Sequence, residues 1–182
     1  MSNKSDASSA ETDEIKRAYA IVGELVMLAS ALDNQMNVVC ITALGLDKTP
    51  MLEPVVASLD SARKVEILKA LAQKISSPSW KKSLVDYAKA VEKVNRARNV
   101  AAHSLLEIDR GKAVLTSTAA AKLFKSIDLQ KKTVEKVALS HLEDGIRIAE
   151  TTLHTGENVI ANFEKADAEF KRRFRDKGPL AG

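Results

Sequence analysis

Apolar residues recur every three or four positions along most of the chain, which is the spacing of helices that bury one face. Gly45 and the loop residues Ser76–Ser79 interrupt this spacing, and Asp60 or Ser61 is placed to cap the helix that follows. The apolar stripes predict five helices, over residues 14–44, 50–59, 62–75, 80–103 and 140–173.

The pattern changes after the fourth of these helices. Two short apolar runs flank a turn that contains glycine, which predicts a β-hairpin over residues 105–116. Residues 119–139 are ambiguous, because 119–124 fit a helical turn and 133–139 alternate like a strand. The sequence therefore predicts an all-α fold, an antiparallel bundle of about five helices with a small inserted β-hairpin.

The length of 182 residues fits one domain with a proper core. Residues 1–13 are rich in serine and acidic residues, and we expect them to be a disordered tail. The helical bundle then covers residues 14–170, and a basic tail follows over residues 171–182. No linker or internal repeat divides the chain, so the bundle is predicted to be a single domain.

Composition and charge limit the expected cellular location and the expected classes of binding partner. The chain has 45% hydrophobic residues, one cysteine, no signal-peptide pattern, and no apolar run near the about 20 residues that span a bilayer. These features favour a cytoplasmic protein with no membrane partner. The net charge of +4 and a pI near 9.1 are compatible with a nucleic-acid partner.

Arg98 interrupts the apolar stripe of the fourth predicted helix. On a helical wheel it falls in line with Val91 and Val94. An arginine in a core needs an anion, because an unpaired buried charge costs several kcal/mol. Asp33 interrupts the stripe of the first helix in the same way, so we expect an Asp33–Arg98 pair, buried or lining a cleft. A purely structural salt bridge is the alternative interpretation.

Asn99 and His103 are four residues apart and share a helix face. Arg98 and His103 are five apart and point about 140° away from each other on a regular helix. The helix end would have to unwind at Ala101-Ala102 to bring them together. Otherwise the site would draw on two copies of this helix across a homodimer interface.

The segment Arg98-Asn99-Val100-Ala101-Ala102-His103 resembles the signature of the HEPN superfamily, in which an arginine precedes a histidine by a spacer of four to six residues. The resemblance implies a metal-independent endoribonuclease without a cofactor, of the kind found in toxin–antitoxin and phage-defence systems. It assigns Arg98 and His103 to the catalytic pair, Asn99 to its polar partner and Asp33 to a loosely kept acidic position. Arg96 also fits the spacing, and the stripe favours Arg98.

Two hypotheses follow. In the first, the protein cleaves RNA by attack of the 2′-hydroxyl on the phosphate, with His103 and Arg98 in the site. It would be a homodimer that pairs through the helix carrying this motif, and an antitoxin or other protein is a possible partner. In the second, it is a non-catalytic helical interaction protein, or an RNA- or nucleotide-binding protein, with a structural Asp33–Arg98 pair. The spacings typical of metal sites, phosphate-binding loops and serine-hydrolase motifs are absent from the sequence.

Overall fold

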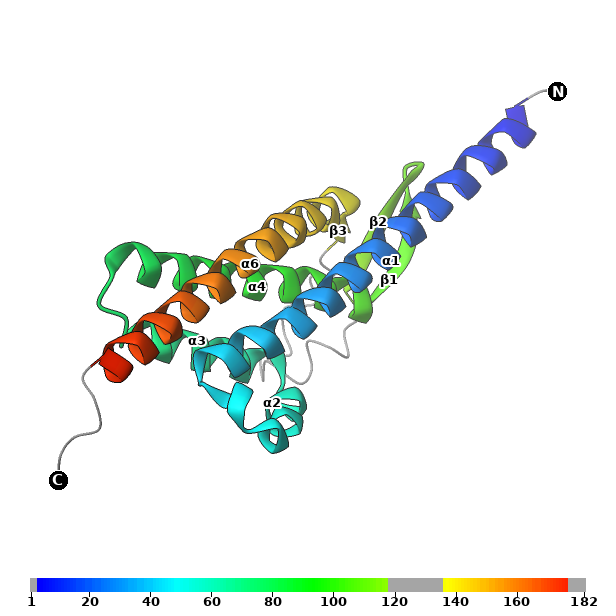
Figure 1. The fold of residues 1–182 in the computed structure, drawn as a ribbon. Coiled ribbons are helices and arrows are strands. Elements are labelled where there is room, and N and C mark those ends of the chain that lie inside the picture. The colour runs from blue at the N-terminus through cyan, green and yellow to red at the C-terminus, as the bar shows by residue number, and fades with distance from the viewer. Residues whose placement is uncertain (1–2, 118–135, 177–182) are drawn as a thin grey trace, which may run out of the picture. The chain divides into compact units, whose positions relative to one another are not determined.

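The structure, a computed structural model, describes residues 3–117 and 136–176 (Figure 1). The described residues are mostly helical, as predicted, and they include a small antiparallel sheet. The suggested helical turn at 119–124 lies outside the described residues. In chain order the elements are α1 (Asn3–Ala43), the 3-10 helices η1 (Leu46–Lys48) and η2 (Pro50–Leu52), α2 (Glu53–Ser58), α3 (Ser61–Ala72), α4 (Pro78–His103), β1 (Ser104–Asp109), β2 (Lys112–Ser117), β3 (Lys136–Ala138) and α6 (Leu139–Asp176).

Backbone contacts group the chain into two compact units. The first unit comprises Met1–Ser30 and Lys93–Ala149, and the second comprises Ala31–Glu92 and Glu150–Gly182. Helices α1, α4 and α6 each contribute residues to both units. None of the described helices has a stretch long and apolar enough to cross a membrane.

The two terminal helices extend further than the sequence pattern predicted. Helix α1 begins at Asn3, so it covers most of the segment for which we expected disorder. That segment contains no proline or glycine after residue 2, and each residue added to an existing helix gains one backbone hydrogen bond without a new nucleation cost. Helix α6 continues to Asp176, into the segment predicted to be a basic tail.

The hairpin predicted at residues 105–116 is confirmed as β1 and β2, which pair antiparallel from Ser104↔Ser117 to Asp109↔Lys112. The sheet is larger than the predicted hairpin, because β3 pairs antiparallel with the other edge of β2. An isolated two-stranded hairpin is at best marginally stable in water, and a third strand lends it support. The alternation noted from residue 133 onward matches β3 over residues 136–138.

In the first unit, α6 and α4 approach each other very closely at a glycine. A Cβ atom added to Gly145 of α6 would lie 2.8 Å from the Cβ of Ala97 on α4 and 3.3 Å from Cδ1 of Leu25 on α1. A side chain at residue 145 would therefore collide with both helices. The apolar core of this unit contains Ala18, Ile21, Leu25, Ala29, Val94, Ala97, Ala113, Leu115, Leu139, Leu142, Ile146 and Ala149.

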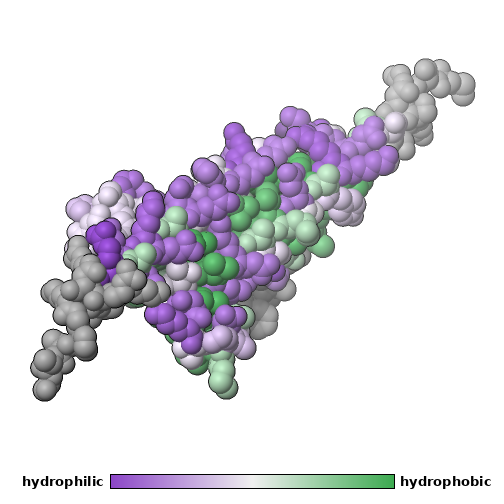
Figure 2. Space-filling view, viewed as in Figure 1, coloured by the Kyte–Doolittle hydropathy of each residue, from purple (hydrophilic) through white to green (hydrophobic). Residues whose placement is uncertain are grey.

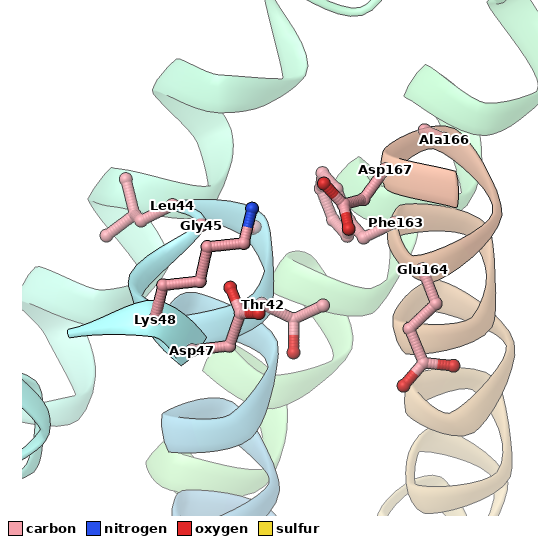
Figure 3. A pocket seen from close by; sticks show the side chains of 10 residues that line it. Thr42, Leu44, Gly45, Asp47, Lys48, Phe163, Glu164, Ala166 and Asp167 are labelled. Atoms are coloured by element: carbon pink, nitrogen blue, oxygen red, sulfur yellow. The ribbon is translucent and has the colours of Figure 1, made fainter. Parts of the chain in front are cut away.

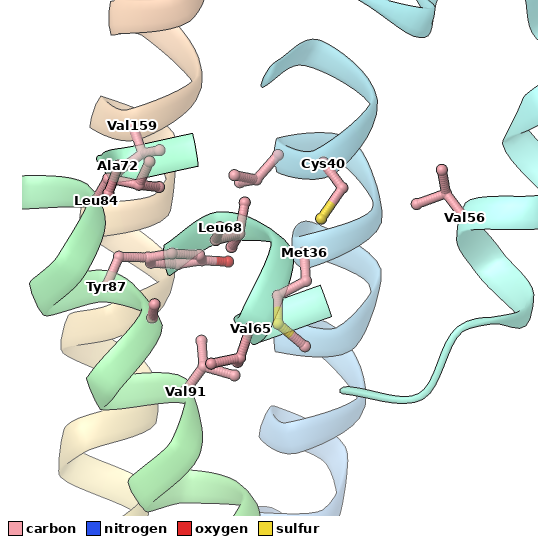
Figure 4. Close-up of a cluster of buried hydrophobic side chains, with 12 residues drawn as sticks. Met36, Cys40, Val56, Val65, Leu68, Ala72, Leu84, Tyr87, Val91 and Val159 are labelled. Atoms are coloured by element: carbon pink, nitrogen blue, oxygen red, sulfur yellow. The ribbon is translucent and has the colours of Figure 1, made fainter. Parts of the chain in front are cut away.

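The second unit has a core of aliphatic side chains around one buried tyrosine (Figure 4). Tyr87 of α4 donates its hydroxyl to Oε1 of Gln35 at 3.2 Å, and Nε2 of Gln35 donates to the carbonyl of Leu153 at 2.7 Å. Gly156 leaves the space that the Gln35 amide occupies, since a Cβ there would lie 2.0 Å from Oε1 of Gln35. Tyr87, Gln35 and the carbonyl of Leu153 therefore form a hydrogen-bonded chain inside this core.

The ends of the second unit's helices follow the sequence signals. Asp60, one of the two predicted candidates, is the N-cap of α3, and its carboxylate accepts a 2.8 Å hydrogen bond from the backbone N–H of Arg63.

Large apolar side chains remain exposed on η2 and α2, namely Met51, Leu52 and Val55. Figure 2 shows this hydrophobic surface over α2.

We predict that Gly145→Ala lowers the free energy of unfolding by about 1 kcal/mol, because the overpacking cost exceeds the helix-propensity gain of alanine. Gly23→Ala is the matched control, since Gly23 also lies in a helix but has no atom within 4 Å of an added Cβ. It should raise the free energy of unfolding by about 0.5–1 kcal/mol. Urea unfolding of both variants measures whether each free energy of unfolding falls or rises. A stabilised Gly145→Ala protein would contradict the close packing of α4 and α6.

Candidate functional site

Helix α4 is continuous to His103, and it carries Arg96, Arg98 and Asn99 in its last turns. All four side chains are exposed. The suggested unwinding at Ala101-Ala102 does not occur, because the helix includes both residues. The directions of these side chains therefore follow regular helix geometry.

The prediction that Arg98 lies on the core-facing stripe is wrong. Ala97 is the buried residue at this level of α4, with 2% exposure, and Arg98 is exposed. The cause is the contact between Ala97 and Gly145, which turns the small Ala97 side chain toward α6. Arg98 follows Ala97 by about 100° around the helix and so faces solvent.

The expected Asp33–Arg98 pair is replaced by another pair inside the second unit. Asp33 accepts hydrogen bonds from Nζ of Lys64 at 3.2 and 3.3 Å and from Oγ of Ser61 at 2.8 Å. The Lys64 side chain is 0% exposed, whereas the Asp33 side chain is 41% exposed. The buried cation that the Asp33 carboxylate compensates is therefore a lysine of α3. Lys64 could have been found from the sequence, since it stands four residues before Leu68 on the apolar stripe of α3.

Three of the four candidate residues on α4 share one face of the helix. Arg96, Asn99 and His103 fall within about 60° of each other on the helical wheel, whereas Arg98 points about 140° away from His103. We call Arg96, Asn99 and His103 the α4 ridge. Arg98 donates from Nη1 to Oδ1 of Asn99 at 3.4 Å, a long contact between neighbours in sequence. Within one chain, Arg96 is therefore the arginine that accompanies His103.

Positive charge gathers in the part of the chain that contains the α4 ridge. Residues 93–136 hold ten lysines and arginines and four acidic residues, a net charge of +6, although the whole chain has a net charge of only +4. Residues 93–106 contain three cationic and no acidic side chains. This concentration of positive charge can be seen in the sequence, although the average composition of the whole chain hides it. Positive charge in this segment favours an anionic ligand for the ridge.

Two titratable side chains in the second unit are deeply buried. Burial raises the pKa of the Cys40 thiol to about 11, with the Asp33 carboxylate adding to the rise and the Lys64 ammonium opposing it. Burial also raises the pKa of the Tyr87 hydroxyl above its ordinary value. Since thiolate and phenolate are the reactive forms, neither group is a candidate nucleophile. No group of three histidine, cysteine or acidic side chains within the described residues is arranged to hold a metal ion.

A cavity of about 410 Å³ in the second unit lies between the end of α1 with η1 and the later turns of α6 (Figure 3). In Figure 3 the side chains of Phe163 and Asp167 face Lys48 across it. None of the candidate site residues predicted from the sequence lines this cavity. The α4 ridge is instead an open surface of the first unit.

Comparison of the chain with models of protein families, with curated proteins and with solved structures gave no match. A functional interpretation of this protein therefore depends on its own residues and their arrangement.

The Asp33–Lys64 pair gives a stability prediction. Asp33→Ala leaves the buried Lys64 ammonium without its counter-charge and should lower the free energy of unfolding by about 3 kcal/mol. Lys64→Met should cost about 1 kcal/mol or less, because water still reaches the carboxylate of Asp33. The double variant should recover most of the loss caused by Asp33→Ala. Urea unfolding of the three variants checks this order, and equal losses in the two single variants would contradict it.

Proposed function

We propose that this protein is a metal-independent endoribonuclease of the HEPN type, and that the α4 ridge is its catalytic surface. The observation that carries the proposal is the placement of Arg96, Asn99 and His103 along one exposed face of an unbroken helix. On this face the arginine can bind a phosphate, the asparagine amide can donate a neutral hydrogen bond, and the histidine can carry a proton.

In the proposed reaction, His103 accepts the proton of a ribose 2′-hydroxyl while the 2′-oxygen attacks the adjacent phosphorus. The bond between phosphorus and the 5′-oxygen breaks, and that oxygen receives a proton. The products are a 2′,3′-cyclic phosphate and a 5′-hydroxyl end. Arg96 donates two hydrogen bonds to the phosphate oxygens, on which negative charge increases in the transition state.

The leaving 5′-oxygen needs a proton donor as well as the base. Each chain supplies one histidine to the α4 ridge. A second copy of the chain, with its motif helix facing the first, would supply a second histidine as the acid. This is why we propose a homodimer as the active form, as the resemblance also implies.

The charge distribution supports an RNA substrate over a neutral ligand. RNA carries one negative charge for each nucleotide, and neutralising phosphates with lysine and arginine supplies much of the affinity of such complexes. The segment 93–136, which begins with the ridge, carries a net charge of +6. The second hypothesis, a non-catalytic interaction or binding protein, included a structural Asp33–Arg98 pair. It loses that support because Asp33 pairs with Lys64 and Arg98 is exposed.

His103→Ala tests the proposed function. In EDTA, the wild-type protein should cleave total RNA and leave 2′,3′-cyclic phosphate ends, and His103→Ala should lower the rate by about 10²–10⁴-fold. The melting temperature should stay almost unchanged, because His103 is exposed at a helix end.

His154→Ala is the matched control, since it removes another exposed histidine, on α6 in the second unit. It should cleave RNA at the wild-type rate. Absence of EDTA-resistant cleavage by the wild-type protein across varied RNAs would overturn the proposal, and so would an equal rate in His103→Ala.

A further inference from the structure

The turn between β1 and β2 contains an arginine in an unfavourable backbone conformation. Asp109 pairs with Lys112, so Arg110 and Gly111 form a two-residue turn, and their φ angles are 52° and 76°. Turns with positive φ at both positions favour Asn-Gly or Asp-Gly. Arg110 is the one non-glycine residue with positive φ within the described part of the chain. An arginine held there against local preference points to a use for its side chain.

The acidic residues next to this turn already have hydrogen-bond donors. Oδ2 of Asp109 accepts from Nζ of Lys136 on β3 at 2.9 Å, and Oε2 of Glu107 accepts from Oγ1 of Thr116 at 2.8 Å. Arg110 and Lys112 are both exposed. Lys136 balances the charge of Asp109, so Arg110 and Lys112 place two positive charges at the turn itself. The Glu107 carboxylate accepts from a neutral hydroxyl and keeps its negative charge three residues before Arg110.

The strand β1 fixes the distance from this turn to the α4 ridge. It begins directly after His103 and has six residues, which at about 3.3 Å per residue span about 20 Å. Figure 1 shows β1 leaving the end of α4 in this way. A stacked strand of nucleic acid rises about 3.4 Å per nucleotide, so about six nucleotides cover the same distance.

We propose that Arg110 and Lys112, which we call the hairpin tip, bind the backbone phosphates of RNA about six nucleotides away from the cleaved bond. This inference rests on the proposed function, because it places a second contact for the same substrate. Contacts to phosphates position a nucleic acid without reading its sequence. In this proposal the hairpin tip orients the RNA along β1, and the residues of the α4 ridge carry out the cleavage.

Binding of a 12-nucleotide 2′-O-methyl RNA tests the inference, because this probe lacks the attacking hydroxyl and cannot be cleaved by the proposed reaction. Fluorescence anisotropy over a range of salt concentrations gives the affinity and its salt dependence. The double variant Arg110→Asn/Lys112→Gln should bind about tenfold more weakly at low salt, and the slope of log K against log salt should shrink by about 0.7 for each charge removed.

Arg110→Asn alone separates the binding role from a structural role. Asparagine suits the turn better than arginine, so the melting temperature should rise while RNA affinity falls. Arg110→Lys should keep the wild-type salt slope. Lys74→Gln is the control for loss of an exposed charge elsewhere, on the chain segment after α3 in the second unit, and should leave binding unchanged.

Wild-type affinity and salt slope in the double variant would overturn the inference and would leave the proposed function untouched. Failure of the wild-type protein to bind the probe would also overturn it. Conversely, tip-dependent binding without any EDTA-resistant cleavage would support the RNA contact and would refute the nuclease proposal. The two proposals therefore fail on different measurements.

Discussion

The close contact between Gly145 of α6 and Ala97 of α4 fixes the rotation of α4, and the exposed surface of the first unit depends on that rotation. A Cβ at residue 145 would come within 2.8 Å of the Cβ of Ala97, so α6 can lie this close only because the residue is glycine. With Ala97 turned inward, the polar side chains beside it must face solvent. The same rotation leaves the helix face that Arg96 and His103 share exposed to solvent.

In the second unit, the arrangement of charged side chains depends on the burial of one cation. Lys64 is completely buried, and the carboxylate of Asp33 provides the counter-charge that makes its burial tolerable. Around this pair, Tyr87 and Gln35 satisfy each other's hydrogen-bonding groups within an aliphatic core. The charged and polar side chains of Lys64, Tyr87 and Gln35 thus have structural partners inside the second unit, whereas the side chains of the α4 ridge are exposed to solvent.

Periodicity in the sequence predicted the helices and the hairpin, because these depend on local spacing and turn residues. It also identified the polar cluster at the end of α4. It could not predict which residue of that cluster faces the core. Both Ala97 and Arg98 stand three or four residues after Val94, so both fit the stripe, and the choice is made by Gly145 on a helix far away in sequence. The sequence shows Lys64 on the apolar stripe of α3, but which cation pairs with Asp33 depends on how the helices pack.

The central claim is that the α4 ridge performs the chemistry and that Arg96 is its phosphate ligand. Single-turnover cleavage of one RNA in EDTA by Arg96→Ala and by Arg98→Ala tests this claim most directly, because the two variants remove the same side chain two residues apart. We expect Arg96→Ala to slow cleavage by about 10²–10³-fold. Arg98→Ala should change the rate only a few-fold. A larger loss in Arg98→Ala than in Arg96→Ala would contradict the account.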